Sequence, residues 1–160
     1  MARHLLHREI VLPRPLAEVF PFFAEAQNLE RITPPFMRFS ILTPLPITMR
    51  AGTVIDYRIA LGGIPMRWRT LIESFEPGVQ FVDVQLRGPY KLWRHTHRFF
   101  DEGGKTRMTD DVEYEVGFGP AGEVARWLFV GRTLERVFDY RSQVIGERFG
   151  VTSTPNQSAA

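Results

Sequence analysis

The sequence predicts an α+β fold, in which a curved antiparallel sheet of about seven strands wraps around one long C-terminal helix, with two short helices after the first strand. Six consecutive strand-like segments are separated only by short turn sequences, which implies hairpins and not crossovers. Residues 121–149 repeat apolar side chains at helical spacing. A meander of this size curls, and that helix is the element long enough to cover its concave face.

The N-terminal part predicts one strand and two short helices. Residues 4–12 alternate between polar and apolar side chains, as a strand with one buried face does. Pro15 is tolerated in the first turn of the following helix, whereas Pro21 lies deep enough to keep that helix short or kinked. Asn28 is a suitable N-cap for a second short helix over 29–33.

The rest of the chain supplies the meander and the long helix. Glycine and proline pairs separate the expected strands, which are 36–43, 53–61, 66–75, 79–87, 91–100 and 106–116. The face that the helix turns to the sheet is expected to comprise Val124, Leu128, Gly131, Leu134, Phe138, Arg141 and Ile145.

Length and composition predict one soluble domain over residues 1–150, followed by a small, polar, disordered tail over 151–160. The absence of cysteine excludes disulfides, thiol nucleophiles and cysteine-type zinc sites. The N-terminus has no long apolar run, so we expect a cytoplasmic location and no stable membrane insertion.

The charge pattern argues against a nucleic-acid partner. The net charge is only +2, and acidic residues are interleaved with the basic ones. The sequence also has no phosphate-binding glycine loop, nucleophile elbow or dinucleotide fingerprint, so we expect no cofactor.

Three stretches resemble a known superfamily. The runs from Phe81 to Phe99, from Asp110 to Tyr114 and from Phe138 to Arg141 are similar to those of the bacterial polyketide cyclase/dehydrase-like branch of the START/SRPBCC superfamily. The resemblance extends over residues 4–149 and implies the helix-grip fold, with a cavity between sheet and helix. Members of this superfamily bind or transform very different apolar ligands, so the resemblance implies a pocket more firmly than an activity.

The strand around residues 93–99 has one aromatic and one cationic face. Trp93, His95, His97 and Phe99 point the same way, because successive side chains of a strand alternate. A tight turn at Gly103-Gly104 sets His97 opposite Asp110, and the preceding turn sets Asp83 opposite His95. A one-residue slip would reverse these faces, but this register gathers the aromatic side chains on one face.

From this register follow the candidate site residues. The expected ligand-binding residues are Trp68, Thr70, Phe81, Asp83, Gln85, Trp93, His95, His97, Phe99, Tyr114, Phe138 and Arg141. Arg141 has two interpretations, since it could meet an acidic group of a ligand near the cavity mouth or simply pair with a glutamate or reach solvent.

Three functions remain open from the sequence. The first is binding of a small hydrophobic ligand of aromatic, polyketide-like or lipid chemistry. The second is a cyclase or dehydratase in which His97, oriented by Asp110, moves a proton. The third is an interaction module that binds through the C-terminal helix or through the apolar outer stripe of Val82, Val84 and Leu86, because such a stripe should be covered, for example in a homodimer.

Two simpler possibilities accompany the histidines. The His–Asp pairs could serve only to satisfy buried polar groups between adjacent strands. His95-x-His97 also has metal-ligand spacing, with Asp83 or Asp110 as a third ligand, but no further histidine or glutamate points clearly inward, so we expect no metal.

Overall fold

The computed structural model describes residues 2–151. Its strands are β1 (His4–Leu12), β2 (Ser40–Ile41), β3 (Val54–Leu61), β4 (Ile64–Glu76), β5 (Gln80–Arg87), β6 (Leu92–Asp101) and β7 (Thr106–Glu115). Its helices are α1 (Leu16–Phe23), the short 3-10 helices η1 (Ala26–Leu29) and η2 (Pro35–Met37), α2 (Gly119–Ala125), the π-helical turn η3 (Arg126–Val130) and α3 (Gly131–Phe149). The predicted tail, apart from Val151, lies outside the described residues.

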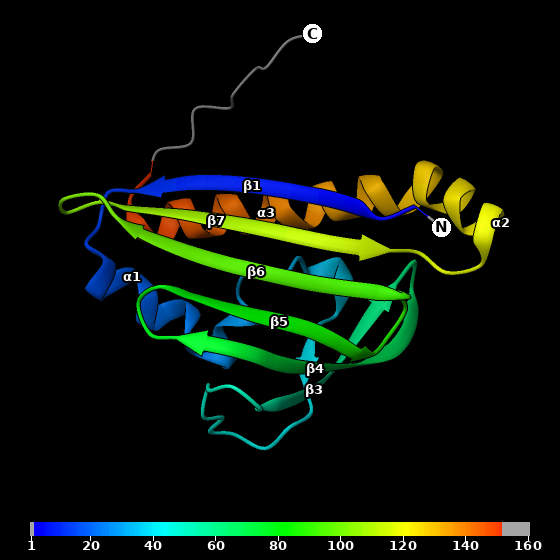
Figure 1. Ribbon diagram of the computed structural model, residues 1–160, viewed down its shortest axis with the longest axis horizontal. Helices are drawn as coiled ribbons and strands as arrows, with labels where there is room; N and C mark the ends of the chain where they lie inside the picture. Colours follow the sequence, from blue (N-terminus) through cyan, green and yellow to red (C-terminus); the bar gives the residue numbers. More distant parts are fainter. Residues whose placement is uncertain (1, 152–160) are drawn as a thin grey trace, which may run out of the picture.

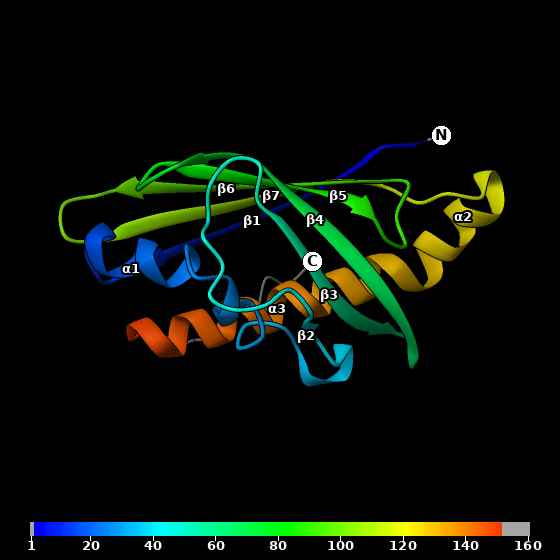
Figure 2. The same cartoon turned by 90° about the horizontal axis from the view of Figure 1, so that it is seen from below.

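The seven strands form one antiparallel sheet in the order β1-β7-β6-β5-β4-β3-β2. Figure 2 shows this sheet curving around α3, with α1 at one end of the concave side. The predicted architecture of a curved sheet around a long C-terminal helix is therefore confirmed. The division into a domain over 1–150 and a separate tail stays a prediction.

The predicted register of the central hairpins is confirmed. His97 pairs with Asp110 across β6 and β7, and Asp83 pairs with His95 across β5 and β6. Gly103, in the turn between β6 and β7, has a φ of 64°, which glycine adopts without steric cost. Because this turn is short, it fixes which side chains share the concave face.

The second short helix differs from the prediction. The 3-10 helix η1 begins at Ala26 and ends at Leu29, so Asn28 lies inside it and is not an N-cap. The Asn28 side chain is buried and donates a hydrogen bond of 2.9 Å to the carbonyl oxygen of Phe22. It therefore ties η1 to the end of α1, and the two elements together close one end of the sheet.

The C-terminal helix is buried over only part of its length. Leu134, Phe138 and Ile145 of α3 are buried as predicted, but Val124 and Leu128 are 57% and 42% exposed. Figure 1 shows the reason, because α2 extends beyond the end of the sheet. The π-helical turn η3 also shifts the helical phase between the two segments.

The outer stripe of β5 is less exposed than the sequence suggests. Val82 is only 4% exposed, whereas Leu86, near the end of the strand, is 53% exposed. The expectation of a homodimer through this stripe stays a prediction. Within residues 2–151, no helix combines the length and the apolar character that crossing a membrane requires.

Candidate functional site

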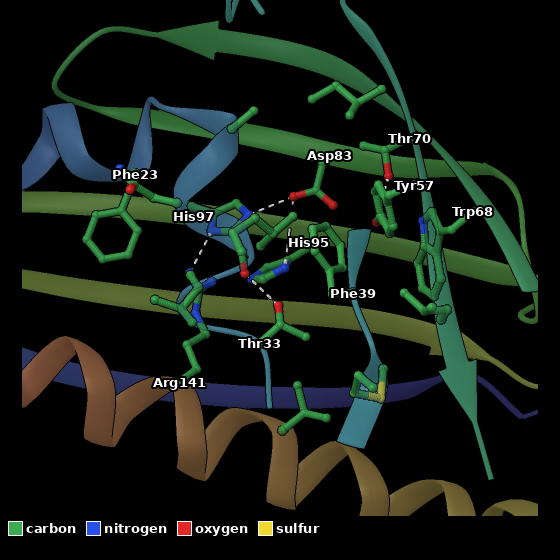
Figure 3. Close-up of a pocket in the computed structure, with 18 of the residues that line it drawn as sticks. Phe23, Thr33, Phe39, Tyr57, Trp68, Thr70, Asp83, His95, His97 and Arg141 are labelled. Carbon is green, nitrogen blue, oxygen red and sulfur yellow. Dashed lines mark hydrogen bonds and ion pairs between the residues drawn. The ribbon is translucent and has the colours of Figure 1, made fainter. Parts of the chain in front are cut away.

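A cavity lies between the concave face of the sheet and α3. The volume within which the centre of a water molecule can lie is about 180 Å³, which is far more than one buried water needs. Its lining is mostly apolar and aromatic, and it comes from β3, β4, β5, β6, α1, η1, α3 and the segment between η1 and β3. Figure 3 shows the lining side chains above α3.

Most of the residues predicted to bind ligand line this cavity. These nine residues are Trp68, Thr70, Phe81, Asp83, Trp93, His95, His97, Phe138 and Arg141.

Three predicted ligand-binding residues do not line the cavity. Gln85 binds the turn between β5 and β6, because its side chain accepts from the Tyr90 N–H and donates to the Tyr90 carbonyl oxygen. Phe99 is buried in the core beneath α1. Tyr114 is buried, with its ring centroid 5.4 Å from that of His4. These three residues therefore stabilise the frame of the cavity.

A cluster of five polar side chains forms the polar part of the site: Asp83, His95, His97, Asp110 and Arg141. His97 Nε2 lies 2.6 Å from Asp83 Oδ2, and His95 Nε2 lies 2.8 Å from Asp110 Oδ1. The shortest contacts thus run diagonally between the backbone pairs. His97 Nδ1 also lies 3.1 Å from Asp110 Oδ1, whereas the predicted pair of His95 and Asp83 is separated by 3.9 Å and makes no hydrogen bond.

Arg141 is part of this cluster and not of the cavity mouth. It is 5% exposed, and it donates from Nε and Nη2 to the two carboxylate oxygens of Asp110, at 3.2 and 3.1 Å. The alternative that Arg141 pairs with a glutamate or reaches solvent is therefore wrong, because its partner is a buried aspartate, whereas contact with an acidic group of a ligand stays a prediction. Asp110 does not line the cavity, so it lies behind the two histidines.

The electrostatics of the carboxylates follow from these contacts. Burial alone would raise the pKa of Asp110, but the Arg141 charge and the hydrogen bonds from His95 and His97 hold it well below its ordinary value. Burial likewise opposes ionisation of Asp83, but the hydrogen bond from His97 and the nearby positive charges lower its pKa. Both carboxylates are therefore ionised at neutral pH.

The two histidines shift in opposite directions. Burial disfavours a charged His97, but its hydrogen bonds to Asp110 and Asp83 outweigh burial and raise its pKa. Burial and the adjacent His97 charge lower the pKa of His95. The rings are stacked, with centroids 3.7 Å apart, so only one of them is readily charged. The arrangement therefore favours a charged His97 beside a neutral His95.

A second, smaller polar group lies on β3 and β4. The Tyr57 hydroxyl lies 3.0 Å from Thr70 Oγ1, and burial raises the pKa of Tyr57, so it stays protonated. Nearby, the buried Trp68 Nε1–H has no hydrogen-bond acceptor within residues 2–151. A buried donor of this kind normally has a partner, so the Trp68 N–H departs from the usual pairing of buried donors.

The structure adds lining residues that the sequence reasoning missed. Tyr57, with Ile55 and Ile59, could have been found, because these residues alternate along β3 in the same way as those of β6. Met37 and Met49 had no such signal, since they lie in segments of low periodicity outside the main strands.

Comparisons with known proteins agree with this geometry. Residues 12–139 match the family described as polyketide cyclase/dehydrase and lipid transport. The chain belongs to this family. A search of curated proteins gives no match.

Solved structures show how widely this fold is used. The Zhui aromatase/cyclase from Streptomyces sp. R1128 matches with a TM-score of 0.73 and 15% identity, over 91% of this chain and 93% of that chain. A START superfamily protein from Mycobacterium smegmatis matches with a TM-score of 0.66 and 12% identity, over 91% and 99%. At such identities the likeness shows the fold alone.

A third structure is more similar in sequence. The nucleoside-diphosphate sugar epimerase from Corynebacterium glutamicum is 26% identical, with a TM-score of 0.65 over 89% of this chain and 28% of that chain. This family member thus resembles one part of a longer protein.

Proposed function

We propose that this protein binds a small hydrophobic molecule, of aromatic, polyketide-like or lipid chemistry, between the sheet and α3. The observation that carries the proposal is the contrast within the cavity, whose walls are apolar except for a few grouped polar side chains. Ligand sites typically have this composition, because apolar walls supply affinity and few polar groups fix orientation. Each buried Å² of apolar ligand surface would contribute roughly 25 cal/mol.

The polar groups indicate which functional groups the ligand has. The rings of Trp68 and Trp93 line the cavity and would pack against a flat or apolar ligand. Asp83 is ionised and lines the cavity, so it accepts hydrogen bonds and would repel a second carboxylate. We therefore expect a ring system or chain with a hydroxyl group, and not a fatty-acid carboxylate beside Asp83.

Tryptophan fluorescence tests this proposal directly. Trp68 and Trp93 line the cavity, whereas Trp127 is 73% exposed, so a Trp127→Phe background leaves only cavity reporters. Titration with 1,8-dihydroxyanthraquinone should quench the emission of this variant saturably, with one equivalent bound. Native mass spectrometry of the same sample should show the mass of the complex.

A matched pair of α-helical variants provides the control. In the same background, Val137→Phe adds volume at the cavity wall, whereas Val124→Phe adds the same kind of side chain at an exposed position. The first variant should weaken quenching at least tenfold, and the second should leave it unchanged. Equal quenching in both variants, or no saturable quenching in the background protein, would refute binding in this cavity.

A cyclase or dehydratase activity is the second candidate. The observation that favours it is His97, which lines the cavity and contacts the carboxylates of both Asp83 and Asp110. The charged form of His97, which the arrangement favours, could give a proton to a ligand oxygen. Asp110 lies behind the histidines, so in this reaction it would position His97 without touching the substrate.

Turnover separates the two candidates. If the protein is such an enzyme, it should cyclise or dehydrate a polyketide-like or β-hydroxy carbonyl substrate, and His97→Gln should lower kcat far more than it changes probe binding. Wild-type protein that binds the anthraquinone but turns over no such substrate would leave binding as the function.

A further inference from the structure

We propose that Asp83, His95 and His97 form a binding site for one divalent transition-metal ion on the cavity wall. Each of the three residues offers one donor atom, and these atoms lie within 4.8 Å of one another. Two imidazoles and one carboxylate, with the remaining positions open, form a common donor set for Zn²⁺ and related ions. The proposal does not depend on the hydrophobic ligand, since it concerns the ion alone.

Asp110 determines which nitrogen atoms face the proposed ion. Its Oδ1 lies 2.8 Å from His95 Nε2 and 3.1 Å from His97 Nδ1. An ionised carboxylate only accepts hydrogen bonds, so both of these nitrogens donate to it. The other two nitrogens, His95 Nδ1 and His97 Nε2, both face Asp83, at 3.9 and 2.6 Å from its Oδ2.

This orientation is the one that metal-binding histidines have. A ligating imidazole usually donates its second N–H to a carboxylate, which fixes the tautomer and the ring direction. Here one carboxylate does this for both rings, and Arg141 holds that carboxylate through two hydrogen bonds. Arg141 Nη2 also lies 3.4 Å from His97 Nδ1, which is longer than its 3.1 Å contact with Asp110.

The charges leave a place for a cation between the three donors. Asp83 and Asp110 contribute two negative charges and Arg141 one positive charge, so the cluster with neutral histidines has a net charge of −1. A proton on His97 balances this charge, but it provides a hydrogen bond for the His97 ring alone. His95 Nδ1 then has no hydrogen bond within residues 2–151. A divalent ion would use all three donors at once.

The observed spacing requires only a small adjustment. Ligand atoms at 2.0–2.2 Å from one ion lie about 3 to 3.5 Å apart. The two distances from Asp83 Oδ2, 2.6 and 3.9 Å, lie on either side of that range. The Asp83 oxygen, whose side chain is 17% exposed, would move away from His97 and towards His95, and the two histidine nitrogens, which lie within 4.8 Å of each other, would take up the same spacing.

The spacing of His95 and His97 could be predicted from the sequence, but the direction of their nitrogens could not. The expectation of no metal rested on the lack of another inward-facing histidine or glutamate. Three protein ligands are enough when the fourth position is left for water or a ligand oxygen. An ion here would occupy the His97 nitrogen that contacts Asp83. Metal binding and proton transfer by that nitrogen are therefore mutually exclusive.

Cobalt binding tests the proposal. Protein freed of metal by a chelator should bind one equivalent of Co²⁺ with visible d–d absorption, and Zn²⁺ should displace it. Asp83→Asn removes a ligand at a partly exposed position and should weaken binding at least tenfold. Asp110→Asn leaves all three ligands in place and should weaken binding about 10- to 100-fold.

A surface histidine provides the matched control. His7 is half exposed and contacts Asp111, so it could bind metal adventitiously. His7→Gln should leave the Co²⁺ stoichiometry and absorption unchanged. Circular dichroism of each variant checks that it is folded. No binding to the wild type at about 100 µM Co²⁺, binding unchanged by Asp83→Asn, or binding lost with His7→Gln would each overturn the proposal.

Discussion

Replacing Arg141 with methionine should destabilise the protein strongly, because it leaves Asp110 buried without its cation. Arg141 and Asp110 are 5% and 6% exposed, and two hydrogen bonds of 3.1 and 3.2 Å join them. Breaking such a pair from one side typically costs about 3–5 kcal/mol. His95 and His97 still donate to Asp110, so we expect about 3 kcal/mol, the lower end of that range.

The double variant distinguishes a charge effect from lost packing. Asp110→Asn alone leaves Arg141 charged and buried, and it should also cost about 3 kcal/mol. Together the two substitutions leave no unpaired charge, so the double variant should be at least about 2 kcal/mol more stable than the sum of the single effects predicts.

Equilibrium urea unfolding of the four proteins, followed by circular dichroism, measures this cycle. The single variants must retain the m-value of the wild type for the comparison to hold. Single effects that add to within about 0.5 kcal/mol would show that the two side chains are not coupled, and the reasoning would then be wrong.

Four further substitutions test the packing and backbone of the fold by the same unfolding assay. Gly122→Ala should destabilise strongly, because its Cβ would lie 1.7 Å from the Gly117 carbonyl oxygen, whereas Gly146→Ala meets nothing closer than 3.5 Å and should be neutral or stabilising by up to about 1 kcal/mol. Phe118 is 88% exposed with a φ of 70°, so Phe118→Gly should raise the free energy of unfolding by up to about 1 kcal/mol, and a clear loss would contradict the strain argument. Ile145 is 1% exposed, so Ile145→Ala should cost about 2–5 kcal/mol, and a cost under about 1 kcal/mol would show that the helix is loosely packed.

The register around the cavity could be predicted because it depends on two short-range features. Alternation along β6 determined which side chains share a face, and the turn at Gly103 fixed the pairing of His97 with Asp110. A slip of one residue would have placed the two histidines on the charged outer face. The alternation of aromatic and polar side chains is therefore enough to predict the register and the inward face of these strands.

Other parts depend on features that alternation does not encode. Two irregularities in the pairing of β4 with β5, one of them between Arg69 and Thr70, interrupt the ladder near Gln85, whose side chain binds the next turn instead of entering the cavity. The overhang of α2 depends on where the sheet ends relative to the helix, so the exposure of Val124 could not be predicted from helical spacing. Asp110 could not be predicted as the partner of Arg141, because that prediction requires the distance between α3 and the sheet.

The two buried aspartates have different positions in the cluster, because Asp110 lies behind the histidines and Asp83 faces the cavity. Asp110 accepts hydrogen bonds from Arg141, His95 and His97 and does not line the cavity, so its capacity as an acceptor is largely used. Asp83 makes one short contact, to His97, and faces the cavity. Whatever enters the cavity, whether a ligand hydroxyl or a metal ion, therefore meets Asp83 and the free nitrogen of His95, while Asp110 and Arg141 hold the rings in place behind them.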